Sequence, residues 1–373
     1  MAPVSPAAAR GAALATLPAM GPARLLAVIR AWGTEEGWAR VRERRALTDP
    51  HVAALCRPDP GGVAAAWAAA AATVDPDEVG RAHAEAGVDV LVLGDAGYPP
   101  VLAGDHEPPA VLFVQGDLTI LDTPRAAIVG TRRCTRYGHD IARRLGGELS
   151  DAGIVVVSGL AAGIDAAAHE GVLEASGAPP AGVVGSGHDV VYPRSNRRLW
   201  RRVAEAGVLV SEAPLGARPE QWRFPARNRI IATLGQVVVV VESHRAGGSM
   251  HTVDAGDTRS RPILAVPGPI VSPASAGTNR LIADGCTPVL ETGDVLVALG
   301  LATAGRRQPA ADTRATPVGE EATVLDALGF APASLDQLVS RTGLRPPAVA
   351  LALARLEADG WVVATAGWWE RRT

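Results

Sequence analysis

The chain has 373 residues, 47% of them hydrophobic, and a formal net charge of -3, so it is long and apolar enough for two or three domains. All 36 basic residues are arginines, and the absence of lysine excludes a Walker-type phosphate loop, a Schiff-base lysine and a lysine nucleophile. The small net charge excludes a basic field over the whole molecule, so a nucleic-acid partner would need a local patch of arginines.

The cysteines and the apolar runs indicate a cellular compartment. Cys56, Cys134 and Cys286 lie far apart and match neither a zinc motif nor a disulfide framework, so we expect a reducing, cytoplasmic location and no metal site. Arg10 and several prolines interrupt the alanine-rich N-terminus, which makes it a poor signal sequence. The apolar run 237–241 is too short to span a bilayer, so we expect no membrane partner.

Residues 1–85 are predicted to form a helical N-terminal domain, because apolar positions recur at helical spacing between glycine and proline breaks. The segment "LATLPAMGPARLLAVI", residues 14–29, resembles a SAM-like or helix-hairpin-helix-like module, in which backbone amides of the hairpin can meet a phosphate. A plain helical bundle explains the same pattern, so we assign no binding residues to this domain.

Residues 86–300 are predicted to form an α/β domain, an extended Rossmann-like, doubly wound and mostly parallel sheet. Apolar runs without alternation are typical of strands that are buried on both faces of a parallel sheet. Each run ends in small or polar residues, at the sheet edge where ligands of such folds bind. Six runs alternate with helical segments: "RAAIVG", "GIVVVSG", "AGVVGSG", "GVLVSE", "QVVVVVES" and "RPILAVPG".

Residues 301–317 are rich in Ala, Pro and Thr without apolar periodicity, and we interpret them as a linker. Residues 318–373 read as three helices followed by a short hairpin, which is the element order of a winged-helix domain. This segment has seven acidic residues against five arginines, so its charge argues against strong DNA binding and favours a contact with protein.

The segment "GTRRCTRYG", residues 130–138, follows the first of these strands and precedes a helix. It is not the GxGxxG motif, and the next strand ends in serine and glycine instead of an acidic residue, which weakens a dinucleotide interpretation. Between residues 125 and 145 there are six arginines and one acidic residue, so we predict a phosphate cradle at Gly130, Thr131 and Arg132. The alternative is that these arginines coat a solvated helix face.

The segment "SGLAAGIDAAAHE", residues 158–170, supplies a second glycine-rich turn that a ligand can approach closely. Asp165 and His169 are four residues apart and share a helix face. They form either an acid–base pair or, as we favour, a capping group and a structural histidine, because no nucleophile is evident.

Two further segments place arginines and glycines at the same sheet edge. Arg227, Asn228 and Arg229 stand near the start of a helix as a second phosphate clamp, and the nearby Phe224 and Trp222 either stack on bases or pack in the core. A third turn, within residues 242–256, contains Arg245, Gly247, Gly248 and Ser249. A mononucleotide needs one cradle, whereas several cradles along one edge favour a nucleic-acid strand.

The motifs that carry a family resemblance are "GTRRCTRYG", "SGLAAGIDAAAH", "VYPRSNRRLW", "SEAPLGARPEQWRFPARNRIIA", "GGSMHT", "AVPG" and "GTNRLIADG". Their order resembles the DNA-processing protein A (DprA/Smf) family. The resemblance implies a Rossmann core that binds single-stranded DNA, protects it and promotes loading of the RecA recombinase in natural transformation, competence or related recombination. It also implies a homodimer formed through the Rossmann-like domain, no catalytic residue and no cofactor.

The turns and the resemblance together give a set of predicted single-stranded-DNA-binding residues. Three features depart from the family, and we expect them to affect the strength of DNA binding. Ala162 stands where many members have a bulky or basic residue, and Ala226 where some members have a basic one. The segment "RAGGSMHT", residues 245–252, replaces a more usual Lys/Arg-Ser-Gly-Ser pattern. The predicted residues are Gly130, Thr131, Arg132, Tyr137, Gly138, Ser158, Gly159, Gly163, Asp165, Arg227, Asn228, Arg229, Arg245, Gly247, Gly248 and Ser249.

Two alternatives stay open at this point. The first is a Rossmann-like nucleotide N-glycosidase or another nucleotide-binding enzyme, with Glu212 and Glu242 at strand ends as general acid and base. The second is an adaptor whose arginine edge binds acidic proteins, which predicts weak DNA binding that does not depend on DNA length.

Overall fold

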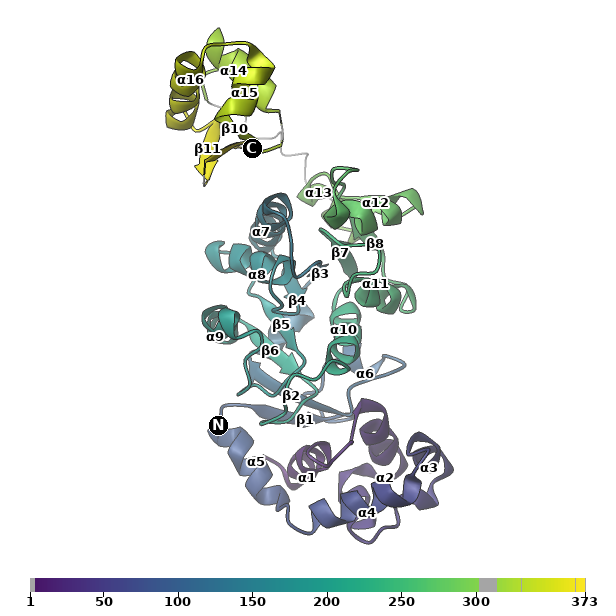
Figure 1. The fold of residues 1–373 in the computed structure, drawn as a ribbon. Coiled ribbons are helices and arrows are strands. Elements are labelled where there is room, and N and C mark those ends of the chain that lie inside the picture. The colour runs from purple at the N-terminus through teal and green to yellow at the C-terminus, as the bar shows by residue number, and fades with distance from the viewer. Residues whose placement is uncertain (1–3, 302–313, 330, 366, 373) are drawn as a thin grey trace. The chain divides into compact units, whose positions relative to one another are not determined.

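The computed structural model describes residues 4–301, 314–329, 331–365 and 367–372, which form two compact units, Met1–Ala304 and Gly305–Thr373 (Figure 1). Within the described residues, the larger unit contains a nine-stranded sheet in the order β1-β2-β6-β5-β4-β3-β7-β8-β9. Its strands are β1 (Asp89–Val92), β2 (Val111–Gly116), β3 (Arg125–Val129), β4 (Val155–Ser158), β5 (Ala181–Val184), β6 (Val208–Ser211), β7 (Val237–Val240), β8 (Ile263–Ala265) and β9 (Thr287–Pro288).

The pairing of the strands confirms the doubly wound, mostly parallel sheet. All neighbours from β6 to β9 pair in parallel, whereas β1 pairs with β2, and β2 with β6, in antiparallel orientation. The chain proceeds from β3 through β4 and β5 to β6 on one side and then returns to β7 on the other side of β3. The sheet therefore has its topological switch point between β3 and β7, where Val129 is the partner of Val240.

Both faces of the central strands are buried, which explains why their sequences are apolar throughout. Ile128, Val156 and Val239 pack with the helices of one face, and Ala127, Val157 and Val238 pack with those of the other. The first face carries α7 (Arg136–Asp151), α8 (Ile164–Glu174), α9 (Arg197–Ala206) and α13 (Thr292–Ala298), and the second carries α6 (Pro100–Ala103), α10 (Arg223–Leu234), α11 (Met250–Asp257) and α12 (Ala276–Ala283) (Figure 1). Short 3-10 helices are η1 (Ala46–Thr48), η2 (Leu118–Asp122), η3 (Arg194–Asn196) and η4 (Pro273–Ser275).

The starts of the N-terminal helices are defined by local sequence. Each helix has proline in its first turn, and all but α2 have a side-chain cap from Ser or Asp. They share one apolar core with the outer strands, because Val90, Val92 and Phe113 pack among them. The predicted boundary after residue 85 thus falls inside one compact unit and one core. The helices are α1 (Pro6–Ala15), α2 (Pro22–Arg42), α3 (Pro50–Leu55), α4 (Pro60–Ala71) and α5 (Pro76–Glu85).

The second unit has the winged-helix order that the sequence predicts: α14 (Glu320–Leu328), β10 (Ala333–Ser334), α15 (Leu335–Thr342), α16 (Pro346–Ala358), β11 (Val362–Thr365) and β12 (Trp368–Arg371). Its three strands pair in the order β10-β12-β11, and its core includes Leu325, Leu338 and Leu353. Most of the predicted linker, 302–313, lies outside the described residues. Within the part of the chain that is described, no helix combines the length and hydrophobicity that crossing a membrane requires.

Candidate functional site

An open cleft of about 590 Å³ lies at the switch point between β3 and β7. Its walls come from the loop after β3, the start of α8, the first turns of α10 and the turn after β7. Segments that are more than 100 residues apart in the sequence, such as 130–132 and 247–249, therefore meet at this edge. Nine of the predicted residues line the cleft: Gly130, Thr131, Arg132, Asp165, Arg227, Asn228, Gly247, Gly248 and Ser249.

The loop after β3 is held by the backbone on both sides. The Thr131 amide donates to the Glu242 carbonyl at 2.7 Å, and the Thr131 carbonyl accepts from the Ile164 amide at 3.3 Å. Gly163 has a φ of 81°, and a Cβ there would lie 2.4 Å from the Thr131 carbonyl oxygen, so only glycine lets the two turns meet. The predicted first and second turns thus form one unit, in which Gly163 acts as a support behind the cleft.

Arg132 is exposed at the cleft and makes no ion pair among the described residues. Its guanidinium carbon lies 4.7 Å from the centre of the Phe224 ring, a cation–π contact that orients the side chain without neutralising it. The charge of Arg132 also acts on the buried Asp165, where it opposes the rise in pKa that burial causes. Because no ion pair among the described residues covers the exposed guanidinium, Arg132 can bind an anion in the cleft.

Glu242 anchors the start of α7 from below the loop. Its carboxylate accepts hydrogen bonds from the Thr135 amide at 2.8 Å and from Thr135 Oγ1 at 2.6 Å, and the residue is 1% exposed. Gly138 lies directly against it, because an added Cβ would lie 2.3 Å from Glu242 Oε2. Tyr137 and Ser158 lie outside the cleft lining, with hydroxyls that donate to the carbonyls of Pro267 and Ile128 respectively.

Asp165 and Arg227 form the floor of the cleft around Gly159. The Gly159 amide donates to Asp165 Oδ2 at 3.2 Å, and Arg227 Nη1 donates to the Val183 carbonyl at 2.7 Å. Burial raises the pKa of Asp165, and the charge of Arg227 opposes that rise. Burial also lowers the pKa of Arg227 to about 10, so the guanidinium stays charged at neutral pH. His169, the other half of the considered acid–base pair, is fully buried, and burial lowers its pKa to about 4, which agrees with the structural role.

Asn228 and the turn after β7 complete the cleft. Asn228 Nδ2 donates to the Gly248 carbonyl at 3.3 Å, and Ser249 donates from Oγ to Ser243 Oγ at 2.8 Å, so both fix the turn to its surroundings. Arg245 is exposed on the same turn but does not line the cleft.

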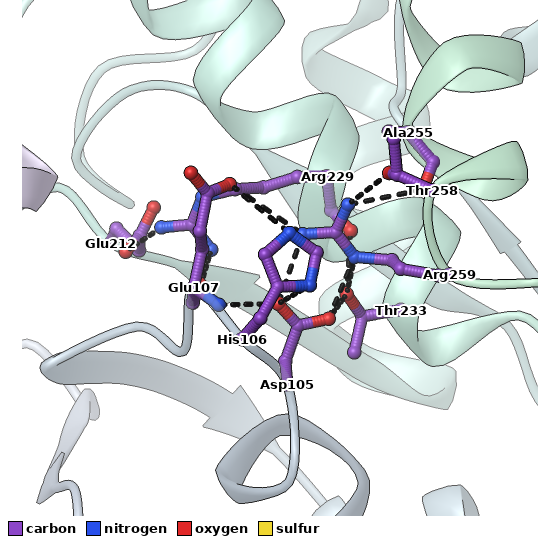
Figure 2. A network of polar contacts seen from close by, with 9 residues as sticks. All are labelled: Asp105, His106, Glu107, Glu212, Arg229, Thr233, Ala255, Thr258 and Arg259. Atoms are coloured by element: carbon purple, nitrogen blue, oxygen red, sulfur yellow. Dashed lines mark hydrogen bonds and ion pairs between the residues drawn. The ribbon is translucent and has the colours of Figure 1, made fainter.

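Arg229 lies on another face of α10 and belongs to the network in Figure 2. Its guanidinium pairs with the Glu212 carboxylate and donates to the Glu107 carbonyl at 2.7 Å. In the same network Arg259 binds the buried Asp105 with two hydrogen bonds, at 2.6 and 2.9 Å. Burial alone would raise the pKa of Asp105, but the hydrogen bonds from Arg259 and Thr233 outweigh it and hold the pKa at about 2.

Sequence reasoning misses several residues of the cleft lining, among them Arg133 and Tyr192. Tyr192 adds an aromatic ring to the cleft. It is 43% exposed in the cleft, and its ring centre lies 5.4 Å from that of Phe224 in a tilted arrangement. A smaller cavity of about 110 Å³ adjoins this pair and Arg132. Tyr192 belongs to the motif "VYPRSN", one of the motifs that carry the family resemblance. The motif could therefore have identified Tyr192 as a site residue, although the tyrosine is not part of a helical or strand pattern.

The cleft combines an unpaired arginine, glycine turns and two adjacent aromatic rings, which suits phosphate and base contacts. Among the described residues, no group of three or more His, Cys, Asp or Glu side chains is arranged to hold a metal ion.

The comparisons with known proteins point in the same direction. The family model described as "DNA recombination-mediator protein A" matches residues 89–300, and the model "DprA winged helix domain" matches residues 308–367. The chain is 37% identical to the DNA processing protein DprA of Bacillus subtilis over 57% of this chain and 72% of the relative. It is 34% identical to the Protein Smf of Escherichia coli over 74% of this chain and 75% of that relative.

Two solved structures are also similar to the chain. DNA processing protein A of Streptococcus pneumoniae matches with a TM-score of 0.63 and 29% identity, over 79% of this chain and 98% of the other. DNA processing protein A of Helicobacter pylori, solved to reveal its single-stranded DNA binding mode, matches with a TM-score of 0.52 and 29% identity, over 57% of this chain and 95% of the other.

Proposed function

Because the chain belongs to the DNA recombination-mediator protein A family, we propose that it binds single-stranded DNA in the cleft at the β3–β7 switch point. The observation that carries the proposal is Arg132, an exposed cation that forms no ion pair among the described residues and is stacked on an aromatic ring inside the cleft. A similar fold in the Helicobacter pylori protein, described with its single-stranded DNA binding mode, supports the same ligand class.

The residues of the cleft have different roles in DNA binding. Arg132 and the glycine turns contact phosphates, because their charge and backbone are accessible to the cleft. Phe224 and Tyr192 stack on bases, which selects single strands because paired bases in a duplex do not offer their faces. Asp165, Arg227 and Gly159 position this surface from below and do not contact the phosphates themselves.

The finer parts of the proposal concern what happens to the bound strand. The protein protects single-stranded DNA, acts as a homodimer through the Rossmann-like domain and promotes RecA loading in natural transformation or related recombination, in the cytoplasm. The family of recombination mediators and the free thiols of all three cysteines support this setting. The winged-helix unit, with its acidic excess, serves a protein contact.

The hydrolase alternative gains no support from the positions of its two carboxylates. Glu212 is paired with Arg229, and Glu242 holds Thr135 at the start of α7. Both groups therefore have structural partners, and neither lines the cleft.

The test is fluorescence anisotropy with labelled oligo(dT), with a duplex competitor and a salt series. We expect single strands to bind more tightly than duplex, and Arg132→Ala to weaken binding and flatten the slope of log affinity against log salt by about 0.7. Arg201→Ala is the matched control, since Arg201 is 74% exposed on α9 and lies outside the cleft lining. Equal affinities for the two variants at every salt concentration would contradict the proposal.

Recombinase loading needs a separate measurement. RecA ATPase activity on DNA covered by single-strand-binding protein should start sooner with the wild-type chain than with Arg132→Ala. Analytical ultracentrifugation of both proteins reports whether the homodimer forms and whether the variant keeps it.

A further inference from the structure

A second groove of about 870 Å³ lies next to the cleft and has no role in the function proposed so far. One wall is the hairpin between α1 and α2, residues 16–21, which is the segment that resembles a helix-hairpin-helix module. The other wall is the segment 214–223, which leads from β6 to α10. Both walls belong to the same compact unit.

Trp222 presents an aromatic surface in this groove. It is 43% exposed, and its indole N–H donates to Glu220 Oε2 at 2.7 Å, which fixes the orientation of the ring. The guanidinium carbon of Arg223 lies 4.5 Å from the ring centre, and a Cβ on Gly21 would lie 3.9 Å from Cη2 of the indole. Trp222 is thus held at the base of the hairpin with part of its surface open.

The charges around the groove favour an anionic occupant. Arg24 lines the groove, and among the described residues its guanidinium donates to the carbonyls of Ala19 and Leu55, at 2.7 and 3.0 Å, contacts that leave its charge unneutralised. Arg218 is exposed next to the lining Ala217 and has no carboxylate partner among the described residues. The other lining arginine, Arg223, lies 3.6 Å from the carboxylate of Glu220, the one acidic lining residue, so these two charges offset each other. The positive charge of the groove therefore comes from Arg24 and Arg218.

The groove and the cleft are lined by neighbouring residues of the segment 221–224. Gln221 and Phe224 line the cleft, whereas Trp222 and Arg223, between them in the sequence, line the groove. Trp222 and Phe224 are two residues apart at the start of α10, so their rings face different sides of this first turn. A strand on Phe224 would pass around the N-terminus of α10 to reach Trp222.

We propose that the groove binds the segment of single-stranded DNA adjacent to the one in the cleft, with a base on Trp222 and phosphates near Arg218 and Arg24. This inference rests on the proposed function of the cleft, and it makes the N-terminal helical module part of the DNA-binding surface. Bases stack on aromatic rings without regard to sequence, so the groove lengthens the footprint and adds no base preference.

The experiment measures the affinity of the full chain for oligo(dT) of increasing length, from roughly 4 to roughly 16 nucleotides, the range of site sizes for such grooves. Trp222→Ala and Arg218→Ala are compared with Trp222→Phe and with Trp368→Ala, a 45% exposed tryptophan in the other unit. On the longest oligonucleotides we expect Trp222→Ala to bind about 5- to 10-fold more weakly, and Trp222→Phe to retain most of the affinity. On the shortest, which fill only the cleft, both should bind like the wild type.

Photocrosslinking with iodouracil-substituted oligonucleotides and mass spectrometry gives a second readout. Crosslinks to peptides that contain residues 16–24 or Trp222, found only with long oligonucleotides, support the inference. Variants that match Trp368→Ala at every length, together with an absence of such crosslinks, overturn it. In that case the loss of short-oligonucleotide binding in Arg132→Ala still shows whether the cleft itself binds DNA.

Discussion

The cleft and the network of Figure 2 lie on different faces of α10, and both contain arginines that contribute most of their positive charge. In the network, Arg229 and Arg259 are paired with Glu212 and Asp105, and their side chains are 12% and 6% exposed. In the cleft, Arg132 is exposed and stacked on a ring. The comparison teaches that an arginine indicates a ligand only where the fold leaves its charge without a carboxylate, so residue type and position in a motif are not sufficient.

The largest expected effect that tests the difference between paired and unpaired arginines is on the stability of the folded chain. Arg259→Met leaves the Asp105 carboxylate buried without its partner, which should reduce the free energy of unfolding by about 3–5 kcal/mol in urea titrations. Arg201→Met removes an exposed ion pair on α9 and should cost about 1 kcal/mol or less. Similar values for the two variants would show that the network contributes no more than a surface pair.

The second prediction concerns how the free energy of unfolding decreases at acid pH. The pKa of Asp105 is about 2 in the folded chain and 3.8 ordinarily, so its contribution is complete above about pH 5 and is lost as the pH falls toward 2. The contribution is about 2 kcal/mol. Urea titrations between pH 5 and pH 2 should therefore show a steeper loss for the wild type than for Asp105→Asn, and parallel curves would contradict the assignment.

The third prediction tests the floor of the cleft. In Gly159→Ala the new Cβ would lie 1.7 Å from Arg227 Nη1 and 2.6 Å from Asp165 Oδ2, so this buried pair must move. We expect a loss of about 1–3 kcal/mol in unfolding free energy together with weaker binding of oligo(dT). Because the backbone φ at Gly159 is not positive, crowding alone causes the effect. Gly61→Ala is the matched control, because its added Cβ would lie 4.0 Å from the nearest atom and Gly61 lies outside the cleft lining.

The fourth prediction isolates stacking from charge. Phe224→Ala should weaken oligo(dT) binding by about 1–3 kcal/mol, whereas Phe224→Tyr should bind nearly as tightly as the wild type. The slope against salt should stay unchanged in both, since no phosphate contact is removed. A flattened slope in Phe224→Ala would mean that the ring acts by orienting Arg132 instead of by stacking.

Much of the fold is predictable because the apolar runs are unambiguous. The six runs named from the sequence are β3 to β8, and their glycine-rich ends do meet at the switch point. The antiparallel addition of β1 and β2, and their core in common with the N-terminal helices, depend on packing between distant segments. No local pattern in those two strands identifies the helices against which they pack.

The site is predictable to the extent that glycine turns mark sheet edges. The motif "RNR" predicts one clamp from Arg227 and Arg229, yet residues two apart on a helix do not face the same side. Of these two arginines, the structure puts Arg227 at the cleft and pairs Arg229 with Glu212. Helical spacing alone contained that information. The burial of Arg227 and the exposure of Tyr192 did not follow from spacing, because both depend on which loops cover the sheet edge.

The common core of the N-terminal helices and the β1–β2 pair limits how such chains can be rearranged. Val90, Val92 and Phe113 point into the helices, while Leu112 and Val114, alternate residues of β2, belong to the core of the sheet. A chain that starts at β1 would leave one side of this hairpin as a bare apolar surface prone to self-association. Removing or exchanging the helical module therefore requires that the helix-facing residues of both strands change at the same time. A truncation or domain fusion at this boundary alone would yield a protein prone to aggregation.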